Sequence, residues 1–153
     1  MRFKYELTGR GWASGFIEMN SNTFYFATSY ITDALDEMLK ALILLNPELS
    51  PFPVSNSQFE WNEEPGGTVW KFRKIDDLLH VQIMSFENLR NKKQLVIELN
   101  ESCSILEFSE AVVQALDLLL SLHGKEGYKE KWVNYDFPTN NYLKLKGFVT
   151  KKN

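Results

Sequence analysis

The first residues of the chain alternate apolar and charged side chains, which is the pattern of a strand with one buried face. Residues 3–7 hold Phe, Tyr and Leu at every second position. Two more strands are predicted at 12–19 and 23–27. The Asn-Ser-Asn sequence at 20–22 suits a hairpin turn between them, because asparagine tolerates a left-handed backbone.

The spacing of apolar residues then changes to that of a helix. Residues 31–45 place apolar side chains on one helical face, and three prolines within 47–54 end this helix in a loop. Four further strands are predicted at 58–62, 68–74, 79–86 and 95–99. The turns between the first three of these are short, which favours antiparallel pairing of neighbours.

A second long helix is predicted from Ser104 to His123. Ser104 and Glu107 have the spacing of a capping box, and Gly124 is a typical helix end. A short helix is predicted at 139–146, within a C-terminal tail.

These elements predict an α+β fold. We expect one largely antiparallel sheet of about six to seven strands, with two long helices packed on one face. The order is βββα–ββββ–α, followed by the helical tail. The 153 residues are the length of one ordinary domain, so we expect a single domain over 1–153.

Composition narrows the class of protein. Hydrophobic residues make up 44% of the chain and aromatic residues 14%, which argues against disorder. Cys103 is the single cysteine, so no internal disulfide forms, and this fits a reducing compartment. The N-terminus lacks the apolar run of a signal peptide, and the longest apolar run, 41–45, is far too short for a membrane span. We therefore expect a cytoplasmic protein without a membrane anchor.

Charge is distributed unevenly along the chain. Residues 11–70 carry eight carboxylates and one basic residue, Lys40, whereas residues 125–153 carry seven lysines and three carboxylates. A field of one sign steers partners of the other sign. The net charge of −3 disfavours nucleic acid as the main partner. Docking of the tail against the acidic first half explains its lysines and aromatics without a nucleic-acid or lipid partner.

Catalytic candidates are few. Cys103 precedes a helix start, where a thiolate is favoured, and His80 is the base that geometry allows, since His123 lies at the far end of the same helix. The alternative is a half-buried structural cysteine. No residue spacing matches a metal site, and no cofactor is predicted. Gly66 and Gly67 are interpreted as turn residues with positive φ.

The hairpin from Phe59 to Phe72 is the strongest binding candidate. One side of it gathers aromatic residues and should face the core. The other side is acidic, and a rigid acidic element suits docking of a basic partner, although an ordinary solvated face has the same pattern. The predicted partner-binding residues are Glu60, Asn62, Glu63 and Glu64, with Asp76 and Asp77 at the next turn.

Two short segments carry a resemblance to known proteins. Phe3-Lys4-Tyr5-Glu6-Leu7-Thr8-Gly9 and Glu63-Glu64-Pro65-Gly66-Gly67 resemble segments of small bacterial proteins of uncharacterised function. In size, acidity and lack of catalytic motifs the chain also resembles the immunity proteins of polymorphic toxin systems. That resemblance implies a non-enzymatic module that neutralises a basic toxin domain.

Two other hypotheses stay open. One is a small-ligand-binding protein or minor hydrolase that uses Cys103 and His80 on a concave sheet face. The other is a structural homodimer, in which the acidic first half of one subunit meets the basic tail of another.

Overall fold

The computed structural model describes residues 1–90 and 92–153, whose elements follow the order βββα–ββββ–αα. The strands are β1 (Arg2–Gly9), β2 (Trp12–Met19), β3 (Asn22–Ser29), β4 (Asn56–Asn62), β5 (Gly67–Ile75), β6 (Leu78–Phe86) and β7 (Val96–Ser104). The helices are α1 (Ala34–Leu45), α2 (Ile105–Trp132) and α3 (Thr139–Lys152). The α+β class and the antiparallel pairing are confirmed.

The strands form two sheets, so the prediction of one sheet is wrong. The first sheet has the order β1-β2-β3 and the second β4-β5-β6-β7. Strands β3 and β4 are neighbours, yet their described residues form no ladder. Short turns determine which strands pair within each sheet, whereas α1 and a proline-rich loop separate β3 from β4 in the chain. The local pattern therefore does not decide whether these two strands pair.

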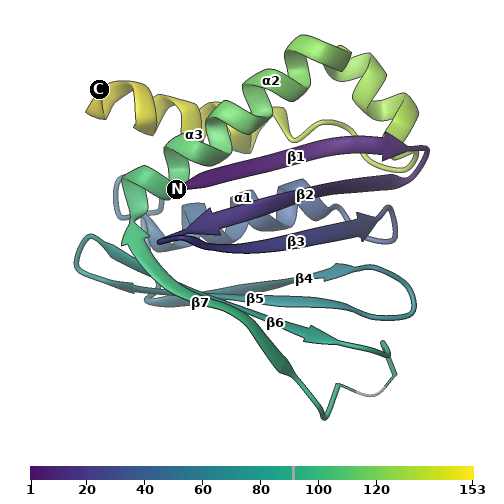
Figure 1. Cartoon of the computed structure of the whole chain (residues 1–153). Helices are drawn as coiled ribbons and strands as arrows, with labels where there is room; N and C mark the ends of the chain where they lie inside the picture. The colour runs from purple at the N-terminus through teal and green to yellow at the C-terminus, as the bar shows by residue number, and fades with distance from the viewer. Residues whose placement is uncertain (91) are drawn as a thin grey trace.

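The described residues form three helices, where the sequence predicted two long helices and a short one at 139–146; the last helix, α3, continues to Lys152. Figure 1 shows α2 running along β1, α3 beside α2, and α1 behind the three-stranded sheet. Helix α1 also packs against β4, and α3 contacts both other helices. The predicted break at Gly124 is confirmed by its φ of 65°, but the chain then resumes helical geometry as far as Trp132.

The core is aromatic along the four-stranded sheet, as the alternation predicts. Phe59 and Trp61 of β4 pack against Trp70 and Phe72 of β5, and the rings of Trp61 and Trp70 are 4.8 Å apart between centroids. All four are buried. The indole nitrogen of Trp61 donates a hydrogen bond to the carbonyl of Ala34, 2.9 Å away, which fastens β4 to α1.

The C-terminal tail docks on its own chain, which confirms the predicted intramolecular role. Tyr128 and Trp132, in the last turns of α2, are fully buried. Lys152 forms an ion pair with Glu48 at 2.9 Å, and Lys151 approaches the same carboxylate at 3.8 Å. Part of the acidic first half is therefore neutralised by the basic tail.

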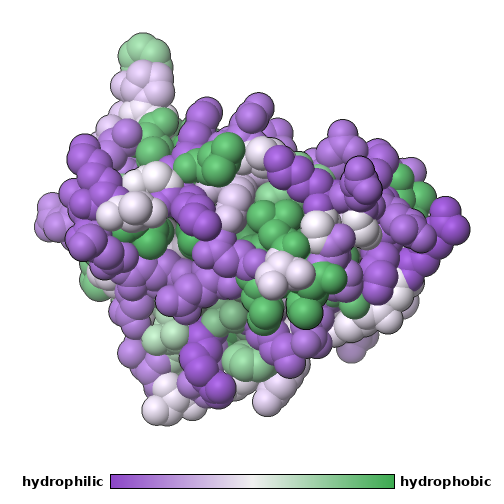
Figure 2. Space-filling model, turned by 90° about the horizontal axis from the view of Figure 1, so that it is seen from above, coloured by the Kyte–Doolittle hydropathy of each residue, from purple (hydrophilic) through white to green (hydrophobic). Residues whose placement is uncertain are grey.

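The side that carries the helices is mostly polar. Figure 2 views the molecule from this side and shows a group of hydrophobic residues in the middle of a largely hydrophilic surface. On α2, Leu118 and Leu122 are 56% and 66% exposed and line a groove beside β1. Among the described residues, no helix combines the length and the apolar character that a bilayer span requires.

Candidate functional site

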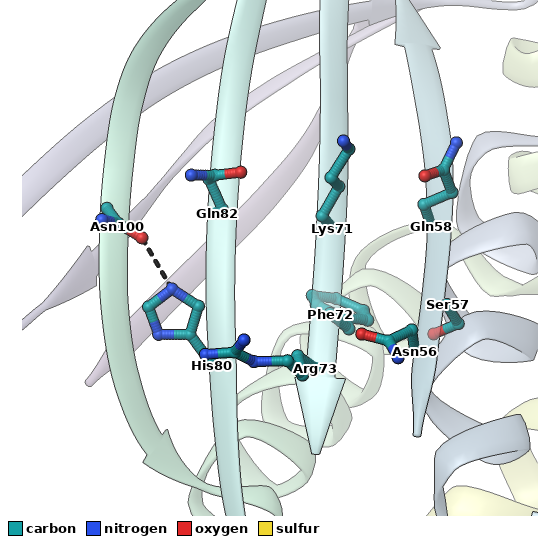
Figure 3. A pocket seen from close by; sticks show the side chains of 9 residues that line it. All are labelled: Asn56, Ser57, Gln58, Lys71, Phe72, Arg73, His80, Gln82 and Asn100. Carbon is teal, nitrogen blue, oxygen red and sulfur yellow. Dashed lines mark hydrogen bonds between the residues drawn. The ribbon is translucent and has the colours of Figure 1, made fainter. Parts of the chain in front are cut away.

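The outer face of the four-stranded sheet carries a regular array of polar side chains. Alternate residues of each strand point away from the core, and the strand register aligns them in two rows across the sheet. One row joins Asn56, Arg73 and His80, and the other joins Gln58, Lys71, Gln82 and Asn100. Figure 3 shows both rows, with Phe72 directed away from them towards the core.

These seven side chains line a hollow of about 530 Å³, which we call the polar hollow. His80 is held in place by its neighbours on β7. Its Nε2 donates a hydrogen bond to Asn100 Oδ1 at 2.6 Å, and its Nδ1 lies 2.9 Å from Ser102 Oγ. Lys71 and Arg73 form no ion pair with any described residue. The polar hollow therefore holds two uncompensated cations among neutral hydrogen-bonding groups.

A second concave site lies where α1 meets the free edge of β4. Glu37 of α1 and Glu60 and Asn62 of β4 line this groove, whose volume is about 520 Å³. Glu63 and Glu64 continue directly from its end, in the β4–β5 turn. We call these five residues the acidic groove. Among the described residues, strand β4 pairs with β5 alone, so the groove follows a sheet edge.

The carboxylates in and beside the acidic groove are held in an unfavourable environment. Burial, and then the charge of Asp36, raises the pKa of Asp33 from 3.8 to about 6. Burial and the nearby Asp33 raise the pKa of Glu37, to which Glu60 also contributes, and burial raises the pKa of Glu63. Desolvation and mutual repulsion both act on Asp33 and Glu37, whereas desolvation alone acts on Glu63.

Two lysines compensate this charge in part. Lys40, which also lines the groove, pairs with Asp36 at 2.8 Å, and Lys92 pairs with Glu60 at 2.6 Å. Glu37, Glu63 and Glu64 form no ion pair with any described residue. The acidic groove therefore keeps a net negative charge.

The structure brings together four of the six predicted partner-binding residues. Glu60, Asn62, Glu63 and Glu64 lie in or beside one groove. Asp76 and Asp77 lie in the β5–β6 turn, at the opposite end of β5. The nine residues of β5 span roughly 30 Å at about 3.3 Å each, so the two acidic turns do not form one surface.

The prediction that Gly66 and Gly67 have positive φ is wrong; these glycines of the β4–β5 turn instead allow a close backbone approach. Neither glycine has a positive φ. A Cβ on Gly66 would lie 2.3 Å from the carbonyl oxygen of Phe86, and one on Gly67 would lie 2.4 Å from that of Trp61. The glycines allow the turn to pack closely against β6 and β4, which fixes the position of Glu63 and Glu64.

The Cys103 and His80 pair does not form. In the register Leu79 pairs with Cys103 and His80 pairs with Ser102, so the thiol and the imidazole lie on opposite faces of the sheet. Burial raises the pKa of the Cys103 thiol to about 12, which disfavours the nucleophilic thiolate. No group of three or more His, Cys, Asp or Glu side chains in the described part of the chain has the arrangement of a metal site.

Comparisons with known proteins add no relationship. No protein family, curated protein or solved structure matches this chain. The sequence analysis missed Glu37, Lys71 and Arg73. The helical spacing of α1 could not show that Glu37 faces β4, whereas the alternation along β5 does place Lys71 and Arg73 together opposite Trp70 and Phe72.

Proposed function

We propose that this protein is a non-enzymatic protein-binding module of the immunity type, which neutralises a basic protein partner by docking it at the acidic groove. The observation that carries the proposal is that Glu37 of α1 and Glu60 of the edge strand β4 line one groove, with Glu63 and Glu64 in the turn that follows β4. Helix α1 is distant from β4 in sequence, and folding places Glu37 on the same concave surface as Glu60.

The energetics of the acidic groove support this role. Partly desolvated carboxylates destabilise the free protein at neutral pH, which agrees with the raised pKa values of Asp33, Glu37 and Glu63, and repulsion between Asp33 and Glu37 adds to this effect. A cationic side chain of a partner would reduce the repulsion between these carboxylates and would give them an ion-pair partner. Fixed charges on a rigid edge also speed the encounter with a partner of opposite sign.

The test compares the two acidic turns. The double variant Glu63→Gln/Glu64→Gln removes two charges at the acidic groove, and Asp76→Asn/Asp77→Asn removes two at the far end of β5. The candidate partners are purified basic proteins encoded by the neighbouring genes, each titrated calorimetrically at low and high salt. We expect the groove variant to bind about tenfold more weakly and to lose most of the salt dependence, with the control within about twofold of wild type.

Equal effects from the two variants would mean that only net charge matters, and the proposal would fail. It would also fail if the groove variant kept full affinity. Neutral amides keep the size of the carboxylates, and asparagine tolerates the positive φ of Asp76, so both variants should fold. Matching thermal unfolding curves would confirm this.

The homodimer hypothesis has less support. It requires the lysines of the tail to be available to a second subunit, whereas Lys151 and Lys152 pair with Glu48 of their own chain. Light scattering at low and high salt would detect a charge-dependent dimer.

A further inference from the structure

We infer that the polar hollow is a second docking site, which binds an extended acidic peptide segment. This goes beyond the proposed function, because the site has the opposite charge and shares none of its charged residues with the acidic groove, although Ser57 and Gln58 line both hollows. It lies on the same sheet, on strands β4 to β7.

The charge of the polar hollow determines the sign of its ligand. Lys71 and Arg73 point outward from the same strand and pair with no described carboxylate. Figure 3 shows the guanidinium of Arg73 reaching across β6 towards the ring of His80. Two cationic side chains on a concave face, without internal compensation, attract an anionic ligand.

The spacing of the charges matches a peptide in extended form. Lys71 and Arg73 are two residues apart on a strand, which is a separation of about 7 Å. Carboxylates at every second position of an extended peptide have the same separation and point to one side. A peptide lying along β5 can therefore place one carboxylate near each cation.

The neutral side chains suit a peptide backbone. The amides of Asn56, Gln58 and Gln82 each offer both donors and an acceptor, which is what alternating N–H and C=O groups require. Among the described residues, the hollow exposes no Phe, Tyr or Trp ring, since Phe72 is 1% exposed and lies on the other face, and its one half-buried ring, that of His80, is held by hydrogen bonds to β7. Single-stranded nucleic acid binds largely by stacking its bases on such rings, so a peptide is the better match.

The probes are a fluorescent peptide of alternating Glu and Thr, a peptide of the same composition with its glutamates in adjacent pairs, and an oligothymidylate of equal charge. Fluorescence anisotropy measures their binding to the full chain. We expect the alternating peptide to bind more tightly than the other two.

Variants locate the binding. Lys71→Gln and Arg73→Gln should each weaken binding of the alternating peptide about threefold to fivefold, as expected for an exposed charge pair. The matched control is Lys74→Gln, which removes a charge from the same strand on the opposite side, where Lys74 lines a different hollow with Phe148. This control should leave the affinity unchanged.

Three results would overturn the inference: no binding of the alternating peptide by the wild type, an equal loss in Lys74→Gln, or tighter binding of the oligothymidylate. The last result would make the hollow a nucleic-acid site. None of these measurements involves Glu63 or Glu64, so failure here leaves the proposed function to be decided by its own test.

Discussion

The inner and outer faces of the four-stranded sheet are built from the same strands, and alternate residues of β5 supply both. Trp70 and Phe72 point inward and are buried, whereas Lys71 and Arg73 point outward and are exposed. The inner face packs against the first sheet and the helices in one continuous core. The outer face carries polar side chains over most of its length, with a small apolar cluster around Val69 at one end.

The difference separates residues that the fold needs from residues that it does not. Burial explains the aromatic residues of the inner face, because each removes a large apolar area from water. Burial does not explain Lys71 and Arg73, because both side chains are exposed and pair with no described carboxylate. Unexplained charges at fixed spacing on a rigid sheet are therefore the better guide to binding.

The largest expected effect is on the inner face. Trp61→Ala should lower the free energy of unfolding by about 3–5 kcal/mol, because it opens a cavity and removes the hydrogen bond to Ala34 that holds α1 on β4. Guanidinium unfolding measures the change. The outer-face control, Gln58→Ala, should change it by less than about 0.5 kcal/mol. Similar losses in both variants would contradict the division between the faces.

The rate of thiol labelling at Cys103 measures how well the inner face is buried, and it requires no mutation. Its thiol is half-buried and its pKa is raised to about 12, first by burial and then by Glu107. At neutral pH, labelling with a disulfide reagent should be slower than in the unfolded chain by on the order of a hundredfold or more. Fast labelling of the native protein would reopen the case for a reactive cysteine.

A smaller effect is expected beside the acidic groove. The folded pKa of Asp33 is about 6, above the ordinary 3.8, so the folded state holds this proton more tightly than the unfolded state. Ionisation of Asp33 therefore destabilises the folded state. This destabilisation is absent below about pH 4 and complete above about pH 6, so the stability of the protein falls as the pH rises through this window.

The variant Asp33→Asn should remove this cost. We expect it to stabilise the protein at pH 7 by about 1 kcal/mol, a value reduced for solvent screening of a half-exposed group. Urea unfolding of wild type and variant across the window gives the difference directly, so other titrating groups cancel. An unchanged pH dependence would show that the carboxylates beside the groove are not under strain.

Local patterns accounted for the elements and for much of the core. The alternation around Trp61 and Trp70 placed the aromatic residues inward, and Gly124 marked a helix break that the structure retains. The burial of Tyr128 and Trp132 agrees with the predicted docking of the aromatic tail on its own chain. Each of these features depends on residues close in the chain, where spacing alone decides which side is buried.

The sequence by itself determined the strands, the helices and the polarity of each face, because a residue's position within a period of two or 3.6 fixes where its side chain points. Only the tertiary structure decided that the strands divide into two sheets, that Glu37 meets Glu60, and that Asp76 lies far from Glu63. Those outcomes depend on how separate elements pack, and the contacts that bring their charges together join residues that no local period relates.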